Sequence, residues 1–379
     1  MYTRISEAKW LERLQRFSSV RAIRDFISER YPALAPERLK RLAIFGAGAE
    51  GQRLVGLCAK QGFDVVAVYD NNAGKRGLLV GACRVMPSDA IGSLERTVPV
   101  VVASHRVLGG VDMLRGLGFN AVPFALLQVM TPDVFPPHMF YAGFLEDLFA
   151  NRDRYIDLAA RLADDESRRV LNGVLGYRLT LDPAELRDII DWDLYGSSGL
   201  LRFSDNEVYV DGGSYDGDSI RMFMDHAGGK FDRVLAFEPD PVTFQRLTDN
   251  FKHEPRVQAF NAGLHRKKAI LRFENDGTRG AIFTNTGSVQ IPVLGLDEVL
   301  DGERVSFIKM NIEGSELEAL KGAEEAIRKW SPKLAISVYH RASDLWQIPE
   351  LVRSLNPSYR LYLRQHDGGV IETVLYACL

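Results

Sequence analysis

The spacing of apolar positions changes several times along this chain, and each change predicts a different kind of segment. Between residues 1 and 37, apolar side chains recur every three or four positions, which predicts amphipathic helices. From residue 41, short apolar runs alternate with helix-length stretches, as in a parallel sheet wound by helices. Helical spacing returns between about 140 and 200, and a second alternation of strands and helices fills the rest of the chain.

This pattern predicts an α/β protein with two Rossmann-like domains joined by a helical connector. We expect N-terminal helices over 1–37, a Rossmann-like nucleotide-binding-type domain over 38–140, the connector over 141–200 and a larger domain over 201–379. The last two apolar runs, "YRLYLRQ" and "ETVLYACL", are separated only by a turn, which predicts a terminal antiparallel hairpin. A chain of 379 residues is long enough to build two such cores.

Composition and charge exclude several classes of protein. The chain is 46% apolar and 26% charged, with a formal net charge of −3, so it has no basic field suited to nucleic acid. No run reaches the roughly 18 apolar residues of a membrane span, and the N-terminus lacks the apolar core of a signal peptide. The three cysteines are scattered, which argues against a disulfide framework. We therefore expect a cytoplasmic protein, and we leave open whether it forms a homo-oligomer.

The first alternating half contains the turn "GAGAEG" directly after the apolar run "LAIF". Its glycines, Gly46, Gly48 and Gly51, have the spacing of turns that bind a diphosphate at a helix N-terminus. Asp70 ends the next predicted strand, at about the 20-residue distance expected of a carboxylate that binds ribose hydroxyls. These residues predict a second nucleotide or nucleotide-sugar site. The alternative is that the glycines only shape a strand-helix junction and bind nothing.

The second half opens with a different turn, "VDGGSYDG", in which Asp211 precedes the glycines. A carboxylate at this point repels a pyrophosphate and attracts a cation. S-adenosylmethionine carries an ammonium and a sulfonium group, so it suits such a turn, and the glycines would let it lie against bare backbone. We expect this cofactor to be bound by Asp211, Gly212, Gly213, Ser214, Tyr215 and Gly217.

Two further strand ends carry groups that suit the same cofactor. Glu238 ends "VLAFE", where its carboxylate can accept hydrogen bonds from both ribose hydroxyls. Asn261 and Ala262 end "VQAFNA" and form a small polar pair suited to an adenine edge. Ligands of open α/β sheets bind at the carboxyl ends of the strands. Three consecutive strand ends thus match three parts of one ligand.

Residues 200–379 resemble the FkbM-type S-adenosylmethionine-dependent methyltransferases. The resemblance rests on "VDGGSYDGDS", "AFEPDP", "NAGL", "LGLDEVL", "FIKMNIEGSELEALKGA" and "PKLAISVYH", which follow the family's order. It implies a seven-stranded class I methyltransferase sheet and O-methylation, often of a sugar hydroxyl in a glycan or natural product. Residues 41–125 resemble, more loosely, small Rossmann domains that hold nucleotide sugars, so the acceptor could be nucleotide-linked. The cofactor contacts that the family resemblance implies are Asp211, Gly213, Tyr215, Gly217, Glu238 and Asn261.

One position departs from the family pattern. Where the family usually has Lys-x-Asp-x-Glu-Gly, this chain has Asn311 in place of the aspartate. An asparagine can accept a bond from the methionine ammonium and donate one to a substrate oxygen, but it cannot take a proton. We therefore place the general base at His340 or Glu313, and we prefer His340 because an imidazole titrates near neutral pH. Either side chain could instead only cap its strand or helix.

Two other functions stay open at this point. One is an oxidoreductase or epimerase that uses NAD(P) or a nucleotide sugar at the first glycine turn, although no Tyr-x-x-x-Lys pair follows within residues 41–140. The other is a non-catalytic scaffold that retains the cofactor pocket, and Asn311 is the residue in its favour. Glu313 and Glu316 are close in sequence, but no histidine is spaced to join them, so we predict no metal site.

Overall fold

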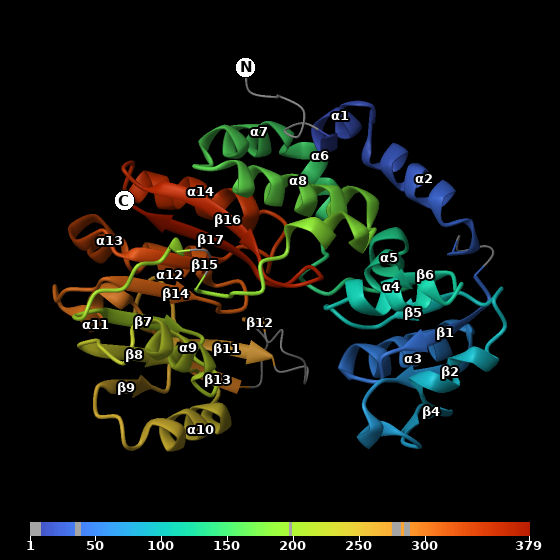
Figure 1. Cartoon of the computed structure of the whole chain (residues 1–379), viewed down its shortest axis with the longest axis horizontal. Helices are drawn as coiled ribbons and strands as arrows, with labels where there is room; N and C mark the ends of the chain where they lie inside the picture. The colour runs from blue at the N-terminus through green and yellow to red at the C-terminus, as the bar shows by residue number, and fades with distance from the viewer. Residues whose placement is uncertain (1–8, 35–38, 197–198, 275–281, 284–288) are drawn as a thin grey trace. The chain divides into compact units, whose positions relative to one another are not determined.

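The structure is a computed structural model of the whole chain, and it describes residues 9–34, 39–196, 199–274, 282–283 and 289–379 (Figure 1). The chain forms two compact units, each assembled from several stretches of sequence. Unit 1 comprises Met1–Asp153, Arg169–Ile190 and Asp367–Ile371, and unit 2 comprises Arg154–Arg168, Asp191–His366 and Glu372–Leu379. The start of the predicted N-terminal helical segment, residues 1–8, lies outside the described residues. The predicted domain boundaries stay predictions, because compactness alone does not show where an independently folding segment begins.

Unit 1 is built on a six-stranded sheet with the order β3-β4-β2-β1-β5-β6. All neighbouring strands in it are parallel except β3 and β4, which form a short hairpin. The predicted apolar runs supply β1, β2, β5 and β6, whereas the hairpin was not predicted. The strands are β1 (Arg41–Phe45), β2 (Asp64–Asp70), β3 (Leu79–Val80), β4 (Cys83–Pro87), β5 (Val100–Val102) and β6 (Ala121–Pro123).

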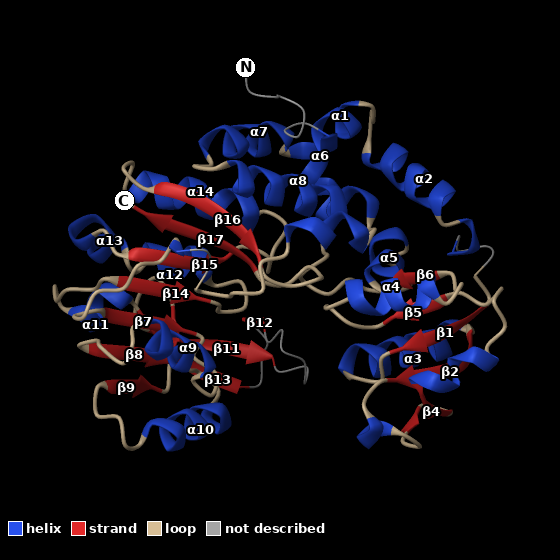
Figure 2. Cartoon of the chain, viewed as in Figure 1, coloured by secondary structure: helices blue, strands red, loops and turns tan. Residues whose placement is uncertain are grey.

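Helices accompany this sheet and form much of the described part of the segments predicted to be helical (Figure 2). The α-helices that precede residue 208 are α1 (Lys9–Gln15), α2 (Val20–Arg30), α3 (Ala49–Gln61), α4 (Leu108–Gly116), α5 (Ala125–Met130), α6 (Phe144–Ala150), α7 (Arg152–Arg161) and α8 (Asp165–Thr180), of which α7 and the start of α8 belong largely to unit 2. Short 3-10 helices are η1 (Pro32–Leu34), η2 (Ala73–Lys75), η3 (Ser88–Ser93) and η4 (Pro183–Ile189). Among the described residues, no helix has the length and apolar character needed to cross a lipid bilayer.

Unit 2 contains the predicted seven-stranded sheet, with the order β16-β17-β15-β14-β7-β8-β9. Five strands run parallel, and the terminal hairpin β16–β17 joins β15 in antiparallel orientation. Tyr209 on β7 stacks on Phe307 of β14 within the core, with ring centroids 4.7 Å apart. The strands are β7 (Val208–Gly212), β8 (Arg233–Phe237), β9 (Val257–Phe260), β14 (Phe307–Met310), β15 (Lys333–Ser337), β16 (Arg360–Gln365) and β17 (Thr373–Cys378).

A second, smaller sheet in unit 2 has the order β10-β13-β11-β12. The apolar run "AILRFEN" supplies one of its strands, β11. Its strands are β10 (Gly263–Leu264), β11 (Ala269–Glu274), β12 (Ile282–Phe283) and β13 (Val289–Leu294). The α-helices of unit 2 after β7 are α9 (Asp218–His226), α10 (Pro241–Phe251), α11 (Leu296–Leu300), α12 (Glu316–Lys321), α13 (Glu324–Trp330) and α14 (Asp344–Leu355).

Residues 162–167 lie along the outer edge of β16, the last strand of the large sheet. Leu162 forms an isolated bridge with Leu361, and the Ala163 N–H donates to the Leu361 carbonyl at 2.8 Å. The Leu363 N–H donates to Ser167 Oγ at 2.9 Å. The backbone groups of this edge strand are therefore partly satisfied by a segment that precedes the sheet by about two hundred residues.

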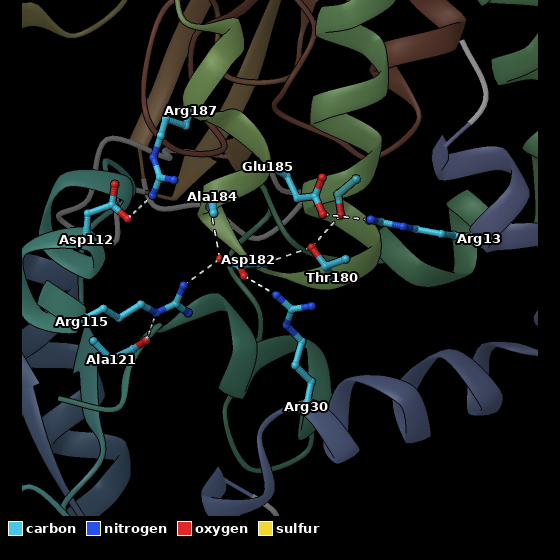
Figure 3. A network of polar contacts seen from close by, with 11 residues as sticks. Arg13, Arg30, Asp112, Arg115, Ala121, Thr180, Asp182, Ala184, Glu185 and Arg187 are labelled. Atoms are coloured by element: carbon cyan, nitrogen blue, oxygen red, sulfur yellow. Dashed lines mark hydrogen bonds and ion pairs between the residues drawn. The ribbon is translucent and has the colours of Figure 1, made fainter. Parts of the chain in front are cut away.

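A network of ion pairs in unit 1 centres on the buried carboxylate of Asp182, which follows α8 (Figure 3). Its two oxygens accept hydrogen bonds from Arg30 at 2.5 Å and from Arg115 at 2.9 Å. Arg115 also donates to the Ala121 carbonyl at 3.0 Å. Burial alone would raise the pKa of Asp182, but the bonds and charges of the two arginines outweigh it and lower the pKa. The carboxylate thus joins α2, α4 and α8 within unit 1.

An Asp182→Asn variant is expected to lose about 1–3 kcal/mol of unfolding free energy, because charge-assisted bonds to a buried acceptor are lost. Because the pKa of Asp182 is lowered in the folded state, its carboxylate stabilises the fold at neutral pH. This stabilisation disappears as the pH falls through the folded-state pKa. Urea unfolding at pH 7 measures the loss. Asp112→Asn is the matched control, since its ion pair with Arg187 is exposed and contributes at most about 1 kcal/mol. Equal losses in the two variants would contradict a central role for Asp182.

Candidate functional site

The parallel strands of the large sheet bring several polar residues to one edge. From β7 the chain proceeds to β8 and β9 on one side, whereas β14 and β15 lie on the other, so the strand order reverses between β7 and β14 (Figure 1). Open α/β sheets bind ligands in the crevice at such a reversal, outside the carboxyl ends of the strands. The predicted cofactor and catalytic residues of unit 2 lie at the ends of strands that finish at this edge or in the segments that follow them.

The turn after β7 approaches the neighbouring strands through bare backbone. The N–H groups of Gly213 and Ser214 both donate to the Phe237 carbonyl at 3.0 Å, which fixes the turn against β8. Gly213 has a φ of +74°, and a Cβ atom there would lie 2.0 Å from the carbonyl oxygen of Asn311. Only glycine fits this position. Tyr215, with a φ of +50°, leaves 46% of its surface exposed at the end of the turn.

Asp211 lies beneath the turn and is fully buried. One of its carboxylate oxygens lies 2.8 Å from Lys309 Nζ, and the other accepts a hydrogen bond from Ser219 Oγ at 2.6 Å. We expected this carboxylate to meet the positive end of the cofactor directly, but both oxygens are engaged within the protein. Direct recognition by Asp211 stays a prediction that these contacts do not favour.

Lys309 is a residue of the site whose role was not predicted. Its ammonium group is buried with Asp211 and also donates to the carbonyls of Gly212 at 3.1 Å and Gly213 at 2.8 Å. A buried lysine needs such partners, because an uncompensated charge in the interior is costly. The signal was available in the run "KMNIEG", but the sequence does not show that the lysine points toward the turn.

Glu238, at the end of β8, is buried and supports the same turn. Its carboxylate accepts hydrogen bonds from the Tyr215 N–H at 3.0 Å and from the Asp240 N–H at 2.9 Å. Burial raises the pKa of Glu238 to about 7, despite these two bonds. Asn261 Nδ2 donates to the carbonyls of Glu238 and Pro239 at 3.0 and 3.1 Å. The structure therefore brings Glu238, Tyr215 and Asn261 together, and the neighbouring Ala262 is buried.

The catalytic candidates gather at the ends of β14 and β15. Asn311 Oδ1 accepts a hydrogen bond from the Tyr339 hydroxyl at 3.0 Å, which orients the amide with its NH₂ group available as a donor. Glu313 adopts a φ of +53° and keeps 33% of its side chain exposed. A residue other than glycine in this region is strained, and such strain is common at functional sites.

His340 is fully buried between two carboxylates. Its Nδ1 lies 3.0 Å from Glu316 Oε1, and its Nε2 lies 3.5 Å from Glu313 Oε2. The expectation that no histidine joins Glu313 and Glu316 was therefore wrong, because the β15 strand end brings this residue to the turn after β14. Glu316 Oε1 also accepts the Ile312 N–H at 2.8 Å, so the cluster is tied to the backbone of that turn.

The charges of this cluster change the protonation state of the His340 imidazole. Burial by itself would lower the pKa of His340, but the charges of Glu316 and Glu313 outweigh it and raise the pKa to about 9. Burial and the charge of Glu316 raise the pKa of Asp344 to about 7. At neutral pH His340 is thus an imidazolium ion, which already carries the proton that a general base would have to accept. The reason for preferring His340, titration near neutral pH, does not hold in this environment.

In unit 1, the glycine turn after β1 has its own internal contacts. A Cβ atom at Gly46 or Gly51 would lie 2.9 or 1.9 Å from a backbone oxygen, whereas one at Gly48 would approach only Lys75 Nζ, at 3.9 Å. Asp70 accepts bonds from the Ala47 N–H at 2.7 Å and from Lys75 Nζ at 2.9 Å. The carboxylate therefore already braces the turn, and binding of a ribose by Asp70 stays a prediction.

Comparison with known proteins identifies the family. Residues 211–367 match the family model of the methyltransferase FkbM domain. The chain is 30% identical over 191 residues to the hexuronic acid methyltransferase AglP of Haloferax volcanii, a match that covers 47% of this chain and 77% of that protein. It is 28% identical over 155 residues to Methyltransferase 1 of Beauveria bassiana, covering 32% of this chain and 61% of that protein.

A solved structure is similar over almost the whole chain. The methyltransferase FkbM from Methylobacillus flagellatus KT is 28% identical, and the match covers 95% of this chain and 100% of that one with a TM-score of 0.72. The residues that match the family model include the glycine turn after β7, Glu238 and the cluster around His340. The chain therefore belongs to the FkbM methyltransferase family.

Proposed function

We propose that this methyltransferase transfers a methyl group from S-adenosylmethionine to a hydroxyl group of a sugar or glycan. The observation that carries the proposal is the pairing of a bare glycine turn after β7 with the buried Glu238 carboxylate after β8. The relative AglP is by its name a hexuronic acid methyltransferase, which supports a sugar acceptor. A nucleotide-linked sugar belongs to the same class of acceptor.

The residues at this edge fit the three parts of the cofactor. Glu238 would accept bonds from the ribose hydroxyls, Asn261 and Ala262 would face the adenine edge, and the backbone of Gly213 to Tyr215 would lie against the methionine portion. When bound, the cofactor supplies a methyl group already activated by its sulfonium charge. We propose an indirect role for Asp211: it holds Lys309 against the carbonyls of Gly212 and Gly213 and so keeps the turn in shape.

The acceptor hydroxyl must lose a proton as it attacks the methyl carbon. We propose Glu313 as the group that receives it, because its carboxylate is partly exposed whereas His340 is buried and protonated. His340 would then be a positioning residue that holds Glu313 and Glu316. Asn311, oriented by Tyr339, would donate a hydrogen bond to the acceptor oxygen. Placing the reacting atoms at about 3–3.5 Å can lower the barrier by about 7–11 kcal/mol, and the base adds roughly 10²–10⁴-fold.

Equilibrium binding tests the cofactor first. Calorimetry on the full chain with S-adenosylmethionine, its demethylated product, NAD and a set of nucleotide sugars should show binding of the first two by unit 2. Transfer of a labelled methyl group to oligosaccharides that contain hexuronic acid then tests the acceptor. Binding of NAD with no affinity for the methyl donor would contradict the proposal. If the protein binds the donor but transfers no methyl group to any sugar, the proposed acceptor class is refuted and the proposed cofactor is not.

Donor binding is expected to weaken as the pH falls through about 7. Glu238 is a carboxylate above this pKa and a carboxylic acid below it, and the protonated form has less capacity to accept bonds from two ribose hydroxyls. Calorimetry at a series of pH values between about 5.5 and 8.5 measures the affinity of the protein for the donor and so the pH dependence. A Glu238→Gln variant should bind weakly and without this pH dependence. A variant that keeps the wild-type pH profile would show that another group titrates.

A further inference from the structure

Three side chains of the kinds that bind metals meet in unit 1. Glu50 lies in the first turn of α3, within the glycine turn itself, His105 follows β5, and His138 lies between α5 and α6. One donor atom from each residue lies within 4.8 Å of the other two. The three residues are far apart in sequence, so their spacing does not indicate a site, and only the fold brings them together.

Two of the three side chains, Glu50 and His105, are oriented by a contact on the side away from the cluster. Glu50 Oε2 accepts a hydrogen bond from Arg53 Nε at 3.2 Å, which directs Oε1 toward His105 Nε2, 3.8 Å away. His105 Nδ1 lies 3.2 Å from the Tyr141 hydroxyl, so the opposite nitrogen of the ring faces the carboxylate. Metal-binding histidines are usually held in this way, through the nitrogen that does not bind the ion.

Aromatic rings pack around the two histidines. The His105 and His138 rings have centroids 5.0 Å apart, and Phe124 and Phe140 pack edge-on against His105. Glu50 and His138 are almost completely buried. An ion bound here would be shielded from water on these sides, which strengthens its attraction to the carboxylate.

We propose that Glu50, His105 and His138 bind a divalent transition-metal ion, with zinc as the best match. Two imidazoles and one carboxylate are a ligand set of three-residue zinc sites, which keep a fourth position for water or a ligand oxygen. The metal site would lie in unit 1 and would be independent of methyl transfer. Water or an oxygen of an anionic ligand such as phosphate would complete the site.

Binding requires small movements that the contacts permit. Zinc bonds of about 2.0–2.2 Å place tetrahedral donors about 3.4 Å apart, so the three side chains would draw closer together. His138 changes most, because its Nδ1 accepts the Phe140 N–H at 3.4 Å. Coordination through Nε2 would place the ring proton on Nδ1. A protonated Nδ1 cannot accept the Phe140 N–H, so this long hydrogen bond would be lost. Arg53 stays on the outer oxygen of Glu50 and is not displaced.

The test is metal titration of the full chain after treatment with a chelator. Cobalt(II) serves as the probe, because a bound ion gives visible ligand-field bands, and zinc should displace it. The wild type should bind one equivalent. Glu50→Gln and His138→Gln should each weaken binding by at least about 100-fold, since even changes outside the first shell cost 10–100-fold. Tyr141→Phe should weaken it by about 10–100-fold.

Controls separate loss of the site from loss of the fold. His253→Gln removes an exposed histidine of unit 2 and should leave the cobalt spectrum unchanged. Circular dichroism and thermal unfolding identify any variant that fails to fold, and Glu50→Gln is the mildest of them because the amide oxygen can still bind Arg53. Absence of ligand-field bands in the folded wild type overturns the proposal. Equal cobalt affinity in the wild type and the folded Glu50→Gln and His138→Gln variants overturns it as well.

Discussion

A Gly213→Ala variant is expected to bind S-adenosylmethionine at least about 100-fold more weakly than the wild type, which corresponds to a loss of about 2.8 kcal/mol. Its positive φ of +74° alone costs an alanine about 1–2 kcal/mol. The added Cβ atom would also lie 2.0 Å from the Asn311 carbonyl oxygen, so the turn or the end of β14 must move. Either movement shifts the backbone that we propose to lie against the methionine portion of the cofactor.

Gly229→Ala provides a closely matched control for this prediction. Gly229 has the same φ of +74°, but a Cβ atom there would meet no described atom within 4 Å. This variant should therefore lose about 1–2 kcal/mol of stability and keep its affinity for the donor. Calorimetry and circular dichroism on both variants measure the two effects. A folded Gly213→Ala variant with wild-type affinity would show that the cofactor does not approach this turn.

A Glu313→Gln variant should retain donor binding and lose roughly 10²–10⁴-fold in kcat, the usual contribution of a general base. Glutamine keeps the size of the side chain and can still contact His340, but it cannot accept the proton of the acceptor hydroxyl. The strained backbone at Glu313 and its contact with the buried ring of His340, whose other nitrogen lies against the buried Glu316, hold this carboxylate in one place.

Methyl transfer under single-turnover conditions, with the oligosaccharide acceptor found in the transfer assay, measures this effect. Glu318→Gln is the matched control, since Glu318 lies on α12 in an ion pair with Lys321. It should leave the rate unchanged. If Glu313→Gln transfers the methyl group at the wild-type rate and with the same pH profile, the base lies elsewhere or the reaction needs none.

Most strands of the two large sheets could be predicted because each of them is a short apolar run bounded by turn residues. "RLAIF", "VYVDG" and "RLYLRQ" all lie where the sequence places them, and the terminal hairpin was predicted from its short turn. The β3–β4 hairpin was missed because β3 is only two residues long. The small second sheet was missed because no local pattern shows that β11 pairs with β13 and not with the large sheet.

The candidate residues could be placed at one edge of the sheet from sequence, but the pairing of their charges could not be predicted. Asp211, Glu238 and Asn311 were found because each directly follows or ends an apolar run. The partner of Asp211 is Lys309, almost a hundred residues later, and no sequence periodicity reports which buried charges neutralise each other. The same limit explains His340, since its protonation depends on Glu316 and Glu313, which only tertiary structure places around the ring.

The segment that lies along β16 has a practical consequence for dividing the chain. A fragment that begins at residue 201 would contain every strand of the methyltransferase sheet but would lack residues 162–167. Its outermost strand would then present unsatisfied backbone groups to solvent, and exposed edges of this kind recruit further chains into aggregates. Such a truncated protein is expected to precipitate or self-associate. A fragment that starts before residue 154 retains residues 162–167, which cover the edge of β16.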